Sequence, residues 1–454
     1  MIKRTEAAAL SLIVMAYLVL ASLYALRTPD WQAPDEPAHY NYIAQLADGD
    51  LPVLEMGDWQ QDYLDELRAT DFDPALLDRL DTLQYEDHQP PLAYALDVPV
   101  YLATDGDLTA IRLFSVLIGA CVIVTAWATL RILLPRWPVV ALVGTAFMAF
   151  LPQHVAILGS VSNDPAAELI VALLLLACVR YVGNTSDPDA VEPPKRIGPL
   201  VLGLLVGAAL FTKTTIYFVA GIAALAVLLR WRRDRWSFGR AVAHLAAVIL
   251  PALLIGGIWW GRNISVYGGT DFVGLQRHDE VTVGQPRTDD YIDTMYGGST
   301  RLYLENYAET TFHSFWGQFG WMELVMPDRI YTILLVFTVA ALAGALLFML
   351  YARGPRRLSG PQWDALLLFA AAFVLVLAAY LIYNLDFVQF QGRYLYPALL
   401  PLALLVGIGL YGWVAPLAAR IPVLSVVPLL VMGILGVFAL YALETYIVPN
   451  LPAW

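Results

Sequence analysis

Two adjacent acids follow the first apolar segment of the chain, in the stretch Ala33-Pro34-Asp35-Glu36-Pro37-Ala38-His39. A carboxylate held close to a membrane surface can act as a general base or as a metal ligand. Asp35 and His39 are four residues apart and share a face if the stretch is helical, whereas Glu36 points elsewhere. We predict catalytic roles for Asp35 and Glu36 and substrate binding for His39. The alternative is a helix capped by Asp35, with Glu36 in solvent.

Three cations stand beside apolar segments, at what we argue below to be the outer side: Lys213, Arg262 and Arg393. Arginine is the preferred bidentate ligand of phosphate, and a neighbouring tyrosine such as Tyr394 can add a hydrogen bond. We therefore predict that Lys213, Arg262, Arg393 and Tyr394 bind a phosphate group in one cavity. The alternative for Lys213 is a lysine that extends its ammonium group to the membrane interface.

Further polar residues at the ends of apolar segments are candidate substrate ligands: His88, Gln89, Asn163, Asp164 and Asn263. Prolines follow two of these pairs and fix the backbone there, because proline restricts its own φ angle and starts helices readily. The alternatives are a turn with a surface histidine at His88 and a helix cap at Asn163 or Asp164.

The elements that must position these residues are membrane helices. Of the 454 residues, 59% are apolar and only 15% are charged, against about 45–50% and about 25% in soluble domains. The two cysteines, Cys121 and Cys178, exclude a disulfide scaffold. Apolar runs long enough or nearly long enough to cross a membrane predict an all-α polytopic protein with about eleven spans. They cover residues 6–26, 108–133, 137–152, 165–182, 198–212, 214–230, 240–260, 329–351, 363–383, 394–418 and 421–445.

The distribution of charge predicts the orientation of these spans in a cell membrane. Lys and Arg concentrate in the short loops, which therefore face the cytoplasm, whereas most of the 39 acids lie in two long loops, 27–107 and 261–328. This places the N-terminus in the cytoplasm and the C-terminus outside. The net charge of −12 argues against nucleic acid as a partner.

The two long outer loops differ in character, and we expect the whole chain, 1–454, to form one transmembrane domain around them. Loop 27–107 has the pattern of short amphipathic helices near 37–47, 59–68, 74–83 and 91–103, the last of them interfacial. Loop 261–328 is rich in Gly, Thr and Asp and is expected to be irregular up to about Thr300.

The ordered set of motifs resembles the C-type (GT-C) superfamily of membrane glycosyltransferases, close to a prokaryotic family of predicted membrane proteins and more distantly the protein O-mannosyltransferases and aminoarabinose transferases. The matching pieces are Pro34-Asp35-Glu36-Pro37-Ala-His39, His88-Gln-Pro-Pro91, Ser162-Asn-Asp164, Lys213, Arg262-Asn263 with Tyr267-Gly268, Ser314 to Trp321, and Gln391-Gly-Arg393-Tyr394.

The resemblance implies transfer of a sugar from a polyprenyl-phosphate donor on the outer face, with inversion and with Asp35 as the general base. It leaves the acceptor open among glycan, lipid and protein. No cofactor is expected, although a divalent metal bound by Asp35, His39 and His88 is an option. The competing interpretations are a transporter or flippase of a lipid-linked sugar and a non-enzymatic scaffold. Transporters place their polar residues near the membrane midplane.

Overall fold

The structure, a computed structural model, describes residues 4–183 and 197–452. Its α-helices are α1 Arg4–Arg27, α2 Glu36–Asp48, α3 Gln61–Ala69, α4 Leu92–Ala103, α5 Leu108–Leu133, α6 Pro138–Phe150, α7 Pro152–Leu158, α8 Asp164–Val182, α9 Pro199–Leu210, α10 Val219–Asp234, α11 Phe238–Tyr267, α12 Leu275–Val281, α13 Thr288–Tyr296, α14 Thr300–Trp316, α15 Asp328–Tyr351, α16 Gly360–Asp386, α17 Leu399–Ala418 and α18 Val427–Ala442. The short elements are the strands β1 Gln318–Phe319 and β2 Leu324–Val325, and the single-turn or irregular helices η1 Pro74–Thr82, η2 Thr214–Ile216, η3 Gly354–Arg356, η4 Gly392–Ala398, η5 Pro422–Val426 and η6 Leu443–Ile447.

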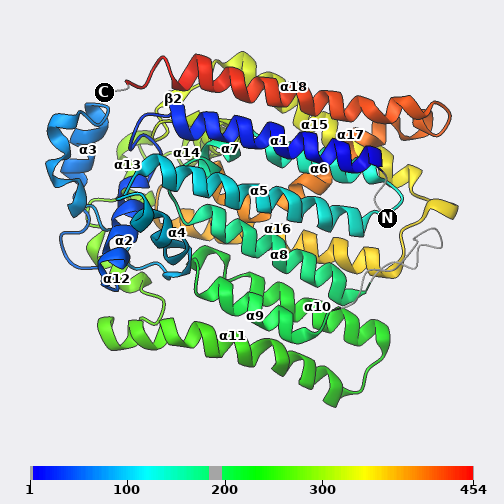
Figure 1. Cartoon of the computed structure of the whole chain (residues 1–454), viewed down its shortest axis with the longest axis horizontal. Coiled ribbons are helices and arrows are strands. Elements are labelled where there is room, and N and C mark those ends of the chain that lie inside the picture. The colour runs from blue at the N-terminus through cyan, green and yellow to red at the C-terminus, as the bar shows by residue number, and fades with distance from the viewer. Residues whose placement is uncertain (1–3, 184–196, 453–454) are drawn as a thin grey trace.

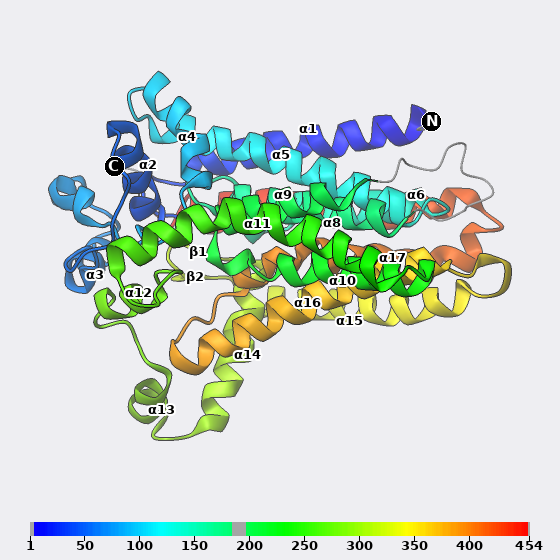
Figure 2. The ribbon, with the colours of Figure 1, turned by 90° about the horizontal axis from the view of Figure 1, so that it is seen from below.

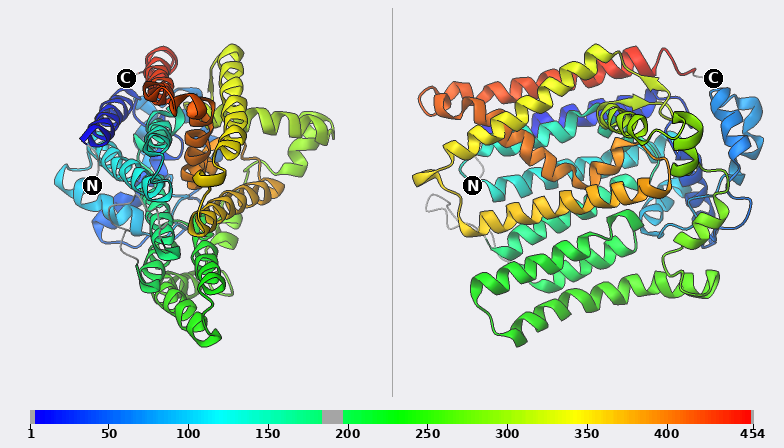
Figure 3. Two further views of the ribbon diagram at one scale, coloured as in Figure 1. Left: turned by 90° about the vertical axis from the view of Figure 1, so that its right-hand side faces the viewer. Right: turned by 180° about the vertical axis from the view of Figure 1, so that it is seen from behind.

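The long helices run side by side and form one bundle (Figure 1). Helices α2, α3, α4 and α12 gather at one end of it, which we call the loop end, and α13 and α14 project from the same end (Figure 2). The N-terminal end of α1 lies at the opposite end. Seen along the bundle, α11 and α18 lie at opposite edges (Figure 3), and they are among the least buried spans, whereas α8 and α17 are the most buried.

Membrane-spanning character is clear for most predicted segments, although the exact number stays a prediction. Nine helices of the described residues are long and apolar enough to cross, and the pair α6 and α7, bent by 66°, would make ten. The remaining predicted span is α9, an apolar helix of only 12 residues. The α6–α7 bend has a local cause, because Leu151 before Pro152 is extended rather than helical, as residues before proline prefer.

Glycines allow the close packing of α15 against α17. A Cβ added to Gly409 or Gly412 would collide with the backbone of α15 at Ala341 or Gly344, and one added to Gly344 would collide with Gly409. Small residues at such crossings let membrane helices approach closely. This contact fixes α17, whose preceding turn η4 carries Arg393.

The loop end is built as predicted in the first long loop and differently in the second. The four predicted helices of 27–107 are present as α2, α3, η1 and α4, with η1 of the tighter 3₁₀ type. Tyr63, Leu64 and Phe72 share a small apolar core there. The expectation of irregular chain up to Thr300 is wrong, because α12 and α13 form in that stretch.

The predicted orientation leads to a labelling experiment. Arg357, in the turn between α15 and α16 at the end opposite to α3, is exposed, as is Asp62 in α3 (Figure 1). In protein with Cys121 and Cys178 replaced by alanine, we expect a membrane-impermeant thiol reagent on intact cells to label Asp62→Cys and to leave Arg357→Cys unlabelled. Labelling of Arg357→Cys from outside would contradict the topology. The chain ends and residues 184–196, to which the prediction also refers, lie outside the described residues.

Candidate active site

Asp35 directs its carboxylate into the loop end rather than onto the helix that follows it. Its side chain makes no capping hydrogen bond to α2, so the capping alternative is wrong. Instead the Tyr85 hydroxyl donates to Oδ1 at 3.1 Å, and Arg393 donates to Oδ2 from Nη2 at 2.5 Å. The backbone of Asp35 has φ of +67°, a conformation that is costly for a residue with a side chain and is often found at functional sites.

The surroundings keep Asp35 ionised. Burial by itself would raise the pKa of its carboxyl group, but the nearby Arg393 and His39 and the hydrogen bonds from Arg393 and Tyr85 outweigh burial and lower that pKa. Asp35 is therefore an anion throughout the neutral range, held by a cation from the distant end of the sequence.

Arg393 enters the site from η4, just before α17. Only 7% of its side chain is exposed, and its Nε has no hydrogen-bond partner within the described part of the chain. The guanidinium also stands over the Tyr394 ring, with its central carbon 5.6 Å from the ring centre. Tyr394 in turn neighbours Tyr380 and Tyr383, with ring centres 6.2 and 6.3 Å away.

A second ion pair joins Lys213, which follows α9, to Asp164, the first residue of α8. The Lys213 ammonium group contacts Asp164 Oδ1, and its side chain is 12% exposed. The Asp164 carboxylate also interacts electrostatically with Arg393 and His39, so the two pairs belong to one charged cluster. Asp35, Lys213 and Arg393, predicted to share a site, are thus brought together.

A chain of hydrogen bonds holds His39 and Asn163 beside this cluster. Asn163 Nδ2 donates to the Tyr94 hydroxyl oxygen at 3.0 Å, and that hydroxyl lies 3.0 Å from His39 Nδ1. The Tyr94 hydroxyl thus occupies Nδ1 of His39 and leaves Nε2 as the ring nitrogen without this partner. Burial lowers the pKa of His39, although Glu86 and Asp35 act in the opposite direction, so the ring is neutral. Gln89 also reaches this region, since its side-chain oxygen lies 3.4 Å from the Thr214 backbone nitrogen.

Glu36 occupies a different environment from Asp35 and does not face the charged cluster. Its side chain is fully buried and pairs with Arg112 of α5, with Nε to Oε1 at 2.8 Å and Nη2 to Oε2 at 2.5 Å. Oε1 also accepts from the Val161 backbone at 3.0 Å, and Arg112 donates to the carbonyls of Thr28 and Pro29. The predicted catalytic role of Glu36 is therefore replaced by a structural one: the pair fastens residues 28–36 to the bundle.

Arg262, Asn263 and His88 make no hydrogen bond or ion pair with the two charged pairs among the described residues, which corrects three sequence-based expectations. Arg262 donates to the Pro52 carbonyl and to Asn263 and packs over the Trp259 ring. Asn263 uses its amide nitrogen on the Phe272 carbonyl at 3.1 Å, so both ends of its side chain hold the start of the second loop. His88 is buried against the Tyr85 carbonyl, and its ring centre lies 4.4 Å from that of His278. Backbone carbonyls and neighbouring side chains contact these polar groups, including Gln89, whose Nε2 lies 3.2 Å from His88 Nε2.

The possible metal site has no support in these positions. No group of three or more His, Cys, Asp or Glu within the described residues is arranged to hold a metal ion. His88, the third residue of the suggested set, lies against α12 instead.

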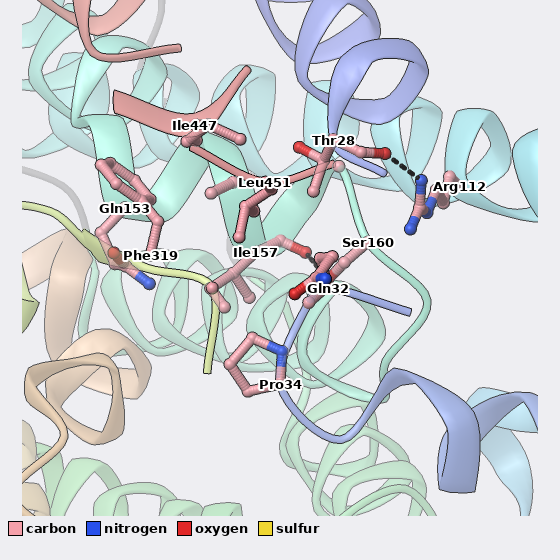
Figure 4. A pocket seen from close by; sticks show the side chains of 14 residues that line it. Thr28, Gln32, Pro34, Arg112, Gln153, Ile157, Ser160, Phe319, Ile447 and Leu451 are labelled. Atoms are coloured by element: carbon pink, nitrogen blue, oxygen red, sulfur yellow. Dashed lines mark hydrogen bonds between the residues drawn. The ribbon is translucent and has the colours of Figure 1, made fainter. Parts of the chain in front are cut away.

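A small pocket lies behind the segment that carries Asp35 (Figure 4). Thr28, Gln32 and Pro34 form one wall, and Ile157 of α7 and Ser160, which follows that helix, form another. Its volume of about 30 Å³ suits a single water molecule and not a sugar. The pocket is therefore too small for the substrate, and its walls include the residues that precede Asp35.

Three residues of the site were missed from the sequence: Tyr85, Glu86 and Arg112. Arg112 carried a usable signal, because a charged residue inside an apolar segment is a candidate for function or for a buried partner. Tyr85 and Glu86 shortly precede His88 in the sequence, but nothing local distinguishes them from solvated neighbours. Their roles come from the fold, which brings Asp35 to them.

The comparisons with known proteins agree with this architecture. Residues 87–260, which include Asp164 and Lys213 but not Asp35 or Arg393, match the family described as dolichyl-phosphate-mannose-protein mannosyltransferase. No curated protein sequence matches the chain. The crystal structure of the Archaeoglobus fulgidus oligosaccharyltransferase tethered with an acceptor peptide is similar at a TM-score of 0.54 and 12% identity, covering 97% of this chain and 55% of that one.

ArnT from Cupriavidus metallidurans bound to undecaprenyl phosphate is similar at a TM-score of 0.49 and 16% identity, covering 88% of this chain and 59% of ArnT. The chain thus spans between half and two thirds of the length of both proteins. The matched family segment and the fold shared with the oligosaccharyltransferase support membership of the chain in the C-type (GT-C) superfamily of membrane glycosyltransferases.

Proposed function

We propose that this protein transfers a sugar from a polyprenyl-phosphate donor to an acceptor at the loop end of the bundle. The observation that carries the proposal is the pairing of Asp35 with Arg393 beside the pairing of Asp164 with Lys213. A base and two cations stand together where α1, α8, α9 and α17 begin or end. The description of the matched family, which names dolichyl-phosphate-mannose, supports a lipid-phosphate sugar as donor.

The two cations are suited to the donor phosphate. In the reaction the bond between the anomeric carbon and the phosphate oxygen breaks, and the oxygen keeps the electron pair. Preorganised cations stabilise the negative charge that develops on such a leaving group. When the phosphate binds Arg393, it competes with Asp35 for the guanidinium and leaves the carboxylate free to act.

Asp35 is suited to the acceptor. Its carboxylate takes the proton of the acceptor hydroxyl or amine while the acceptor atom bonds to the anomeric carbon from the face opposite to the phosphate. This single displacement inverts the configuration at that carbon. The transporter alternative has less support, because the charged pairs lie at helix ends rather than near the middle of the spans.

The assay for the proposal is turnover of polyprenyl-phosphate sugars by the purified protein in detergent, measured as release of the free lipid phosphate in the presence of acceptor extracts. Its sharpest binding test is Arg393→Ala. Because the variant removes a charge-assisted contact to phosphate, we expect affinity for decaprenyl phosphate to fall by about 1.5–3 kcal/mol. Arg357→Ala, an exposed arginine at the other end of the bundle, is the matched control. Equal affinities in the two variants would remove Arg393 from the phosphate site.

A further inference from the structure

Glu86 lies in the turn between η1 and α4, and it differs from the residues on either side of it. Tyr85 donates its hydroxyl to Asp35, and Asp87 accepts from Gln45 Nε2 at 3.0 and 3.2 Å. The half-buried carboxylate of Glu86 makes no hydrogen bond and no ion pair with any residue that the structure describes. Burial raises the pKa of this carboxyl group, although His39, Lys213 and Arg393 act against burial.

Glu86 lies within electrostatic range of the charged cluster. Its carboxylate interacts with His39, Asp35, Lys213 and Arg393. Three other acids of the region each have a cation of their own: Arg393 for Asp35, Lys213 for Asp164 and Arg112 for Glu36. Asp87 has the Gln45 amide instead. Solvent reaches the carboxylate oxygens of Glu86, so a ligand that displaces this water must supply hydrogen bonds in its place.

The partner of Glu86 cannot be the donor phosphate, since two anions repel each other. It is the part of the donor next to the phosphate, because both cations that hold the phosphate lie within electrostatic range of Glu86. That part is a sugar ring whose hydroxyl groups are hydrogen-bond donors, and an ionised carboxylate is the strongest acceptor that a protein offers them. We infer that Glu86 binds ring hydroxyl groups of the sugar being transferred, an assignment that rests on the proposed function.

The groups around Glu86 fit a sugar ring. Tyr94 occupies Nδ1 of His39, so Nε2 is the nitrogen that can form a hydrogen bond with a sugar hydroxyl, which both donates and accepts. Tyr383 and Tyr394 both lie within electrostatic range of Glu86, and 36% of Tyr383 is exposed. Their rings offer an apolar face of the kind that packs against the C–H groups of a sugar, while the polar groups fix its orientation.

The test compares binding of bare decaprenyl phosphate with binding of decaprenyl phosphate that carries mannose, glucose, galactose or arabinose, using purified full-length protein in detergent. We expect the wild type to bind at least one conjugate about tenfold more tightly than the bare lipid, and Glu86→Gln to lose most of that difference. Glu86→Gln should bind the bare lipid equally or more tightly, because the substitution removes a repelling charge. That measurement also shows that the variant is folded. Glu66→Gln, an exposed glutamate in α3, should behave as wild type.

Two results would overturn the assignment of Glu86: a sugar-dependent gain that Glu86→Gln retains, or a wild-type protein that gains nothing from any of the four sugars. Failure of the proposed function looks different. In that case the wild type does not bind bare decaprenyl phosphate, or binding does not depend on Lys213 and Arg393. The two ideas can therefore fail separately.

Discussion

Asp35→Asn is expected to abolish nearly all sugar transfer while the protein keeps its fold and its affinity for the donor lipid. The substitution preserves the size of the side chain and removes its basicity. Positioned general bases contribute about 10²–10⁴-fold to enzymatic rates, so a loss within that range is expected in the turnover assay. The hydrogen bond from Tyr85 can still be accepted by the amide oxygen, which keeps the side chain in place.

The affinity of Asp35→Asn for decaprenyl phosphate should change in a specific direction. In the structure Asp35 occupies Arg393, the same cation that the donor phosphate needs. The neutral amide introduced by Asp35→Asn carries no charge to compete for Arg393, so this variant should bind decaprenyl phosphate at least as tightly as the wild type. Asp62→Asn, which changes an exposed acid of α3, is the control for a general effect of removing one negative charge. Full turnover by Asp35→Asn would show that the proton goes elsewhere, with Glu86 the next acid to test.

Much of the fold could be predicted because membrane spans depend on simple physical requirements. A run of apolar residues must be helical in a bilayer, so the spans and the small helices of 27–107 were recognisable from periodicity. The bend at Pro152 and the helices α12 and α13 were not. A proline in a buried segment can either kink or end a helix, and polar helices such as α13 depend on what they pack against.

The sequence allowed only one prediction about the site: charged residues at the outer ends of spans should lie at a similar height relative to the membrane. Asp35, Lys213 and Arg393 all follow or precede spans, and the bundle places them together as predicted. Their pairing was beyond the sequence, because Asp35 and Arg393 are 358 positions apart. Arg262 also stands at the end of a span, but it does not contact the charged pairs. Its guanidinium donates instead to the Pro52 carbonyl of the other long loop.

Glu36→Gln is expected to destabilise the protein strongly, in contrast to the catalytic role predicted from the sequence. Glu36 is fully buried and Arg112 is 2% exposed, so removing the carboxylate leaves a buried guanidinium without its partner. Breaking a buried ion pair from one side typically costs about 3–5 kcal/mol. Asp30 lies 3.8 Å from Arg112 but is 69% exposed, so solvent weakens any compensation from it.

The position of the Glu36–Arg112 pair determines which measurement should detect the loss of stability. Arg112 also holds the carbonyls of Ala25, Thr28 and Pro29, which fixes the segment that ends at Asp35. Glu36→Gln should therefore lower the denaturation temperature in detergent, and decaprenyl phosphate should recover part of the loss by binding the native state. Replacing both partners, in Glu36→Gln with Arg112→Met, should cost less than Glu36→Gln alone, because no unpaired charge remains in the double variant. Thermal stability that is unchanged in Glu36→Gln would contradict a structural role for the pair and return Glu36 to the list of candidate catalytic acids.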